Sequence, residues 1–183
     1  MAKPSLQLRE ANIDECLALR QHFTNLAEVT LWGGEGYLWP LSKHQFLQKL
    51  MLANTQSFIF LRNQQAVGFG QICDRFGRHH LARLLIFPKF RQQGLAVGLL
   101  HGLLLQAQSI NKRLDFSLYV FKHNEIAQRA YRKLGFTETE QPESPRDDLI
   151  FMTLNQVAAT DYLNKNTHEF IRESSGLCFR MTP

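Results

Sequence analysis

Residues 81–110 constrain the fold of this chain more than any other segment. The mostly apolar run at 81–87 has the composition of a buried strand and ends at Pro88. A short turn follows, and an apolar stretch at 94–110 then has the length of a helix. A strand that passes through a tight turn into a helix is typical of an α/β sheet covered by helices.

The turn at 91–96, Arg-Gln-Gln-Gly-Leu-Ala, opens that helix. The first backbone N–H groups of a helix have no partner within it and lie at the positive end of its dipole. A pyrophosphate can accept hydrogen bonds from several of them. Gly94 allows close approach, Ala96 adds little bulk, and Arg91 adds a charged donor. Tight packing of the helix start explains Gly94 equally well, because a lone glycine turn is weak evidence.

The rest of the chain alternates strands with helices. A strand at 5–9 precedes a helix that Asn12 caps and that extends to about residue 26, and Ser42 caps a second helix. The glycine-rich segment 28–41 between them is expected to be a loop. The other predicted elements are strands at 57–61, 66–73, 114–121, 136–140 and 149–154, and a helix at 124–134. This order predicts an α/β (α+β) fold, with a mixed, partly parallel sheet of about seven strands flanked by about four helices.

These elements predict one domain at 1–154 and a C-terminal extension at 155–183. The extension is apolar enough to pack on the sheet or on a second subunit, which leaves a homodimer open. No apolar run is long enough to cross a bilayer, and the N-terminus has no signal-peptide pattern. We therefore expect a cytoplasmic protein without membrane contact.

Composition argues against two other classes of site. The formal charge is +5, but the basic residues are scattered, so nucleic acid is not an expected partner. Cys16, Cys73 and Cys178 match no metal-ligand spacing. The adjacent residues His79 and His80 would point in opposite directions on a strand, so no metal site is predicted.

A second motif favours the functional interpretation of the glycine turn over the packing interpretation. Residues 124–136 read N-x-x-A-x-x-A-Y-x-x-L-G-F and follow a predicted strand. Together with the R-x-x-G-x-A turn, this pattern resembles the GNAT superfamily of N-acetyltransferases, and most closely the bacterial ribosomal-protein alanine acetyltransferase type. The resemblance is specific over 81–136 and extends loosely over 5–154. It implies an enzyme that moves an acetyl group from acetyl-coenzyme A to an amine without a metal ion.

The resemblance also implies roles for individual residues. Backbone groups of Leu84, Leu85 and Ile86 would face the pantetheine arm and the thioester, and one N–H would stabilise the developing oxyanion. Asn124 would contact the same arm, and Tyr131 would act as general acid toward the leaving thiolate. The residues of the implied pyrophosphate turn are Arg91, Gln92, Gln93, Gly94, Leu95 and Ala96.

The chain departs from the family at the general base. In the relatives that it most resembles, a glutamate on the strand before Asn124 takes this role, and Tyr119 stands in its place here. The candidates for the base are Glu28, Glu35, Asp74, His79, His80, His123 or water held between them. A non-catalytic acyl-coenzyme A-binding module, or a protein-interaction domain, is therefore the alternative to an enzyme.

The predicted loop at 28–41 is the expected acceptor side, because the acceptor enters there in the family. It contains Trp32, Glu35, Tyr37 and Trp39. Aromatic rings with a carboxylate would suit a cationic amine. A hydrophobic lid packed on the core fits the same residues.

Because the family's general base is replaced by Tyr119, we expect the pKa of the acceptor amine to decide which amines react. At pH 7, deprotonating a lysine-like amine of pKa about 10.4 costs roughly 4.6 kcal/mol, against about 1 kcal/mol for an α-amine near 7.8. We expect a small-molecule amine or a peptide N-terminus of low pKa. Steady-state rates over a series of amines should fall as the amine pKa rises. A preference for high-pKa alkylamines with a flat pH profile would contradict this expectation.

Overall fold

The protein folds around one mixed sheet. The computed structural model describes residues 5–166 and 177–180. Within them the strands are β1 (Ser5–Glu10), β2 (Thr55–Arg62), β3 (Gln65–Arg75), β4 (Arg78–Ile86), β5 (Phe116–Phe121), β6 (Thr137–Thr139), β7 (Leu149–Leu154) and β8 (Leu177–Arg180). Their order across the sheet is β6-β7-β5-β4-β3-β2-β1-β8. Among the described strands, β4 and β5 pair in parallel and the other neighbours pair antiparallel, which confirms the predicted partly parallel sheet.

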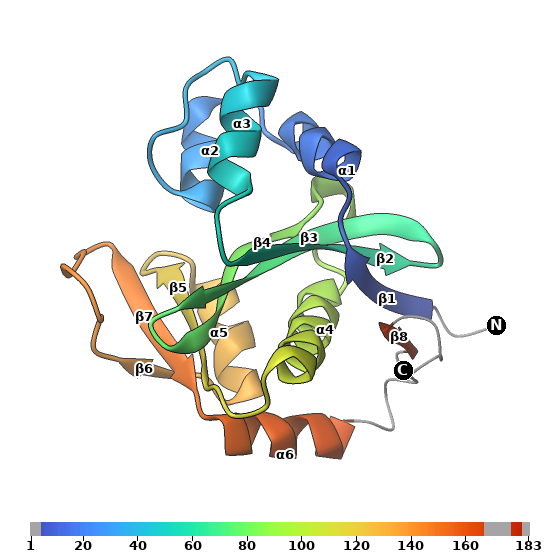
Figure 1. Ribbon diagram of the computed structural model, residues 1–183, viewed down its shortest axis with the longest axis vertical. Helices are drawn as coiled ribbons and strands as arrows, with labels where there is room; N and C mark the ends of the chain where they lie inside the picture. Colours follow the sequence, from blue (N-terminus) through green and yellow to red (C-terminus); the bar gives the residue numbers. More distant parts are fainter. Residues whose placement is uncertain (1–4, 167–176, 181–183) are drawn as a thin grey trace.

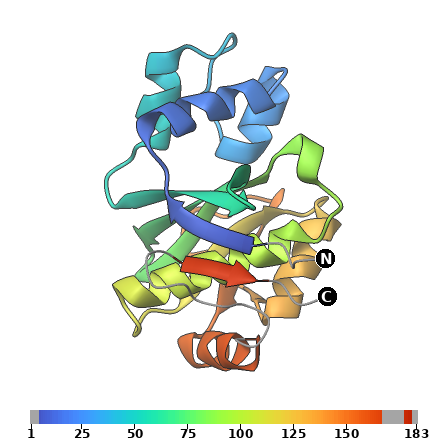
Figure 2. The ribbon, with the colours of Figure 1, turned by 90° about the vertical axis from the view of Figure 1, so that its right-hand side faces the viewer.

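Helices cover both faces of this sheet (Figure 1, Figure 2). The α-helices are α1 (Ile13–Ala18), α2 (Leu26–Gly33), α3 (Lys43–Leu50), α4 (Leu95–Ile110), α5 (Glu125–Leu134) and α6 (Gln156–Asn166), and the 3-10 segments are η1 (Leu19–His22) and η2 (Pro88–Phe90). Helices α1, α2 and α3 form a layer on one face, and α4 and α5 lie on the other. None of the helices in the described ranges is both long and apolar enough to span a bilayer.

The α2 helix corrects the sequence prediction for 28–41, which is wrong up to residue 33. The Asn25 side chain accepts a hydrogen bond from the Glu28 N–H at 3.0 Å, and the Glu28 carboxylate accepts from the Thr24 N–H at 2.7 Å. The first bond satisfies a backbone donor that the first turn of the helix leaves open, and the second fixes the chain just before the N-cap residue Asn25. Gly34 and Gly36, both with φ of +86°, follow the helix. The glycines therefore end a helix that the sequence analysis treated as a loop.

Two apolar clusters flank the sheet. One joins the sheet to α4 and α5 and includes Leu6, Phe60, Leu103 and Met152, all of them fully buried. The other lies beneath α1, α2 and α3 and is centred on rings such as Phe46. Burial of apolar surface on both faces is the main favourable term in folding. It holds the two helical layers against one shared sheet.

The tail beyond the predicted domain boundary packs on the same core. Helix α6 buries Ala159 and Leu163 in the cluster beside α4. Strand β8 pairs antiparallel with β1, with Phe179 opposite Leu6 in the backbone register. The sequence analysis left open whether this segment packs on the sheet or on a second subunit. The structure places α6 and β8 on the fold itself, and β8 adds a strand to the seven predicted.

Truncating the buried side of α6 should destabilise the whole fold. Leu163 is 3% exposed and Val157, on the same helix, is 56% exposed. Leu163→Ala should lower the free energy of unfolding by about 2–4 kcal/mol, because it leaves a cavity in the core. Val157→Ala should change it by less than about 0.5 kcal/mol. Urea denaturation of both variants measures the difference, and equal effects would mean that α6 is not part of the cooperative unit.

Candidate active site

Strands β4 and β5 run side by side only at their beginnings. Parallel pairing joins His79–Leu81 to Phe116–Leu118. Further along, β4 carries a bulge, because Arg83 and Leu84 together oppose the single residue Gly70 on β3. A bulge bends its strand and ends regular pairing. The two strands therefore diverge at their carboxyl ends.

Gly70 makes the bulge fit against the helix below. A Cβ atom at this position would lie 2.7 Å from Leu103 Cδ1 and 3.2 Å from Leu84 Cδ2. Only a residue without a side chain leaves room for both leucines. Above the bulge, Arg83 adopts a φ of +49°, and the Trp32 Nε1–H donates to its carbonyl oxygen at 2.9 Å. The bulge is thus held from both faces of the sheet.

The diverging strands border a cavity of about 600 Å³. Its walls come from β4, from β5 and the turn after it, from α2, from the segment after α3, and from the loop before β7. Leu84, Asn124 and Tyr131, three of the residues implied by the resemblance, line this one cavity. Residues far apart in the sequence therefore meet where the strands part.

The three predicted strand residues have different surroundings. Leu84 lines the cavity and packs on the α4 side of the sheet. Leu85 is buried in the cluster beneath α1, α2 and α3. Ile86 is partly buried on the α4 side, and its carbonyl oxygen accepts a hydrogen bond from Arg91 Nε at 3.2 Å. Among the three, only Leu84 reaches the cavity.

The predicted pyrophosphate turn connects η2 to α4, outside the cavity lining. Gln92 and Gly94 have φ of +63° and +73°, and Gly94 is the N-cap of the sixteen-residue helix α4. Residues 91–94 and Ala96 are exposed, whereas Leu95 is buried. Left-handed residues before an open helix N-terminus present backbone N–H groups to an anion. A Cβ at Gly94 would meet no atom within 4 Å, so the turn is open to solvent at this point.

Asn124 and Tyr131 both belong to α5. The Asn124 side-chain oxygen caps α5 by accepting from the Ala127 N–H at 3.2 Å, which leaves its amide nitrogen available at the cavity. Tyr131 is 9% exposed, and its ring packs beside Phe136. Burial raises the pKa of the Tyr131 hydroxyl to about 12. The hydroxyl is therefore protonated at neutral pH and can donate a hydrogen bond.

The structure separates the base candidates. Two of them, Asp74 and His80, line the cavity. Glu28 caps α2, and the exposed Glu35 pairs with Arg146 at 3.4 Å. His79 faces away from the cavity: its Nε2 lies 2.8 Å from the Asn111 carbonyl oxygen.

The sixth candidate, His123, is exposed and packs its ring beside Phe121. Tyr119, which stands in place of the family glutamate, lines the cavity. It packs against the His80 ring, with the ring centroids 5.7 Å apart. The carboxylate and the histidine that reach the cavity are therefore Asp74 and His80.

His80 is held rigidly in the cavity wall. Its Nδ1 lies 3.0 Å from Ser117 Oγ on β5, and its ring packs edge-on against Phe76. Burial, with a smaller contribution from the charge of Arg75, lowers the pKa of His80 to about 4. The imidazole is neutral at pH 7 and can only be a weak base. This agrees with an acceptor amine of low pKa.

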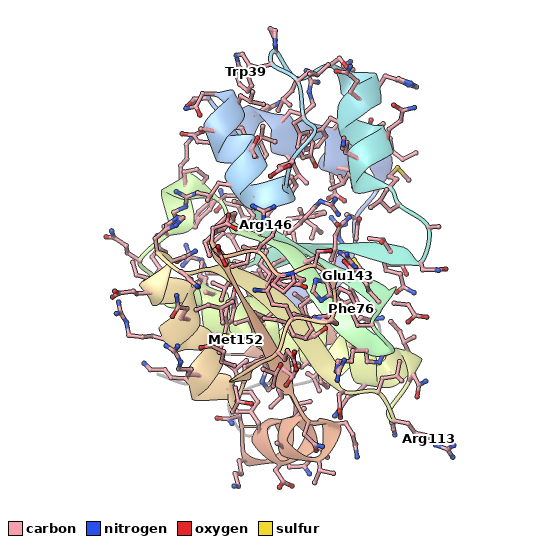
Figure 3. All side chains as sticks on the ribbon, turned by 90° about the vertical axis from the view of Figure 1, so that its left-hand side faces the viewer. Trp39, Phe76, Arg113, Glu143, Arg146 and Met152 are labelled. Carbon is pink, nitrogen blue, oxygen red and sulfur yellow. The ribbon has the colours of Figure 1, made fainter. Side chains whose placement is uncertain are left out.

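The aromatic residues of the acceptor side do not form a cage. Trp32 lines the cavity from α2, and Tyr37 is buried against Phe46. Trp39 is 43% exposed and lies at the far tip of the α2–α3 layer (Figure 3). The packing favours the hydrophobic lid over the cation cage.

Three arginines also line this cavity, Arg75, Arg83 and Arg146. Figure 3 shows Arg146 between the α2–α3 layer and the sheet, with Glu143 nearby. The sequence predicted a role for none of the three. Arg75 ends β3 and Arg146 lies in the loop before β7. The distance between them depends on the folded chain, and no local pattern marks either of them.

Comparison with known proteins supplies the family. Residues 37–155 match the family model of the acetyltransferase (GNAT) domain. The fold is similar to that of spermidine N-acetyltransferase from Vibrio cholerae in complex with coenzyme A and spermine, with a TM-score of 0.68 and 19% identity over 85% of this chain and 98% of that one.

Two further solved structures are similar. An aminoglycoside acetyltransferase in complex with coenzyme A gives a TM-score of 0.69, with 17% identity over 85% of this chain and 98% of that one. An uncharacterised protein from Bacillus halodurans gives 0.70, with 17% identity over 87% of this chain and 89% of that one. At sequence identities of 17–19%, these similarities show a shared fold only.

The buried His80 should make stability depend on pH. Its pKa is about 4 in the folded state and about 6.5 when unfolded, so unfolding takes up a proton as the pH falls below 6.5. Lowering the pH from 6.5 to 5 should therefore remove about 2 kcal/mol through His80, at 1.36 kcal/mol for each pH unit. Urea denaturation at both values should show a smaller loss for His80→Gln than for wild type. The exposed control His123→Gln should keep the full loss, and parallel behaviour of all three proteins would contradict the assignment.

Proposed function

Because the chain belongs to the GNAT family of acetyltransferases, we propose that it transfers an acetyl group from acetyl-coenzyme A to a primary amine, on a small molecule or at a peptide N-terminus. One observation carries the proposal: Leu84, Asn124 and Tyr131 line one cavity at the point where β4 and β5 diverge. Similar folds that act on spermidine and on aminoglycosides support an amine acceptor. The family makes the non-catalytic alternative the less favoured one.

The turn before α4 supports acetyl-coenzyme A as the donor. Gln92 and Gly94 are left-handed, and the exposed N-terminus of α4 follows them directly. Backbone N–H groups in this arrangement would bind the pyrophosphate, and Arg91 adds positive charge beside them. Coenzyme A in the two similar acetyltransferase structures supports the same donor.

The residues of the cavity suggest how the transfer proceeds. The donor supplies an activated thioester, so an amine that attacks its carbonyl carbon forms a C–N bond as the C–S bond breaks. A backbone N–H near the β4 bulge would stabilise the oxyanion. The amine releases one proton, and the thiolate takes one up. No covalent bond to the protein is needed.

Tyr131 has a narrower role in this proposal than that of a full general acid. Its pKa is about 12, whereas a thiol has a pKa of about 8.5. Complete proton transfer to the thiolate would thus be uphill by roughly 5 kcal/mol. A hydrogen bond from the Tyr131 hydroxyl would stabilise the leaving thiolate without that cost.

The proposal also covers the domain boundaries, the type within the family, the location and the oligomeric state. We assign the acetyltransferase domain to 1–154 and treat 155–183 as a C-terminal extension, of which α6 and β8 pack on the domain. The ribosomal-protein alanine acetyltransferase type, a cytoplasmic location and a homodimer remain predictions from the sequence.

Donor binding can be tested at Gly94. In a thermal-shift titration, acetyl-coenzyme A at 100-fold over Kd should add about 2.7 kcal/mol of stability to the wild type. Gly94→Trp should abolish this shift, because the side chain blocks the turn. Gly77→Trp is the matched control, since Gly77 also has a positive φ, of +63°, with no atom within 4 Å of a Cβ. It should keep the shift, and a wild type that shows none would overturn the proposed function.

Turnover can be tested at Tyr131. Tyr131→Phe should lower kcat about 10- to 100-fold, the value of one hydrogen bond to a charged group, and leave acetyl-coenzyme A binding unchanged. Tyr119→Phe removes a hydroxyl from the same cavity that has no role in the proposal. It should change kcat less than threefold. Similar losses in both variants would remove the assignment of Tyr131.

A further inference from the structure

The three arginines of the cavity differ in how their charge is balanced. Arg75 pairs with Glu143 at 2.6 Å, and Arg146 pairs with Asp148 at 2.7 Å. Arg83 donates to neutral oxygens, at 2.7 Å to Gln71 Oε1 and at 2.9 Å to the Lys49 carbonyl. Within the described part of the chain, Arg83 makes no ion pair. The charge of Arg83 thus lacks a carboxylate partner.

The position of Arg83 makes this imbalance costly. Its side chain is half-buried, and Arg83 Nε is buried without an acceptor. Moving a cation out of water without a counter-ion is unfavourable, and the left-handed backbone at φ +49° adds strain. The Lys49 carbonyl lies in the last turn of α3, so the helix dipole offsets part of the cost. Features of this kind gather where a ligand completes the site.

A second unpaired donor lies beside the first. Tyr37 is 4% exposed, and its hydroxyl is buried with no hydrogen-bond partner. The Arg83 side chain acts on this hydroxyl both through its charge and as a near hydrogen-bond partner, although no bond between the two groups meets strict hydrogen-bond geometry. Residue 33 lines the cavity and lacks a side chain: a Cβ there would lie 2.6 Å from the Tyr37 ring. The buried Tyr37 ring therefore packs directly against Gly33, a residue of the cavity wall.

The same wall presents apolar surface. Leu31 and Leu52 line the cavity and are 50% and 51% exposed. Trp32 lines the same cavity, and its N–H is already bonded to the Arg83 carbonyl. Exposed large apolar side chains at a cavity mouth favour an apolar ligand body. The wall thus combines a cation with a hydrophobic surface, and the buried Tyr37 hydroxyl packs against this wall at Gly33.

We propose that the acceptor amine carries a carboxylate and an apolar body, as an apolar amino acid does, and that Arg83 and the Tyr37 hydroxyl bind its carboxylate. This inference rests on the proposed function, because it names the acceptor of that reaction. The carboxylate supplies the negative charge that Arg83 lacks and an acceptor for both donors. A polyamine would instead place a further positive charge beside Arg83, which like-charge repulsion opposes.

Binding of product analogues tests the inference without turnover. Isothermal titration of the full chain with coenzyme A present compares N-acetylphenylalanine with N-phenethylacetamide, which lacks only the carboxylate. N-acetylleucine and N-isopentylacetamide form a second matched pair. We expect the carboxylate to tighten binding at least tenfold in the wild type. Equal affinities within both pairs, or no binding of any of the four, would overturn the inference.

Single substitutions test which residue causes the tighter binding of the compounds that carry a carboxylate. Arg83→Gln should reduce the ratio between the affinity for the carboxylate-bearing compound and the affinity for its carboxylate-free analogue to about one. Tyr37→Phe should reduce it severalfold while the melting temperature stays equal or rises, since the variant removes a buried hydroxyl without a partner. Arg75→Gln is the matched control, an arginine of the same cavity that already has a carboxylate partner, and should keep the ratio. A loss in Arg75→Gln equal to that in Arg83→Gln would overturn the assignment to Arg83.

A thiol-release assay separates this inference from the proposed function. Faster acetyl transfer to phenylalanine than to phenethylamine supports both. Transfer to amines with no preference for the carboxylate leaves the proposed function intact and overturns the inference. Carboxylate-dependent binding without transfer to any amine supports the inference and overturns the function.

Discussion

The separation of β4 from β5 beyond Leu81 is the constraint on which the rest of the structure depends. Up to this residue the two strands share parallel pairing. The bulge opposite Gly70 then bends β4 away, and Leu103 and Leu84 occupy the space that a side chain at Gly70 would need. Without this bend, regular pairing would continue where the cavity now lies. Packing in the core therefore shapes the proposed site.

The same bulge joins the α1–α3 layer to the sheet. The Trp32 N–H donates to the Arg83 carbonyl, and the Arg83 side chain donates to the Lys49 carbonyl at the end of α3. Gln71, on the neighbouring strand, donates to the Leu50 carbonyl at 2.9 Å. The bonds to Lys49 and Leu50 satisfy carbonyls that the end of α3 leaves open. The β4 bulge therefore has two effects: it opens the cavity, and it positions the α1–α3 layer that forms the acceptor side.

Local signals explain which parts of the fold could be predicted. Asn12 and Ser42 cap α1 and α3 as predicted, because each side chain bonds within its own first turn. The predicted glycine turn also precedes α4, with Gly94 in a left-handed conformation. The loop prediction at 28–41 failed because its glycines outweighed a capping signal at Asn25 and Glu28. This capping pattern can be recognised from the sequence, because Asn25 and Glu28 lie within one helical turn of each other.

The sequence by itself determined most of the elements before residue 155, the caps at Asn12 and Ser42, the glycine turn and the family, because each depends on residues within a few positions or within one motif. Only the tertiary structure decided which candidates share a cavity. Arg83 meets Trp32 and Lys49 across separations of 51 and 34 residues, and the Tyr37 ring packs into the space that the missing side chain of Gly33 leaves. Such meetings depend on strand register and on the packing of whole layers. Both are set by the combined burial of many side chains rather than by any local pattern.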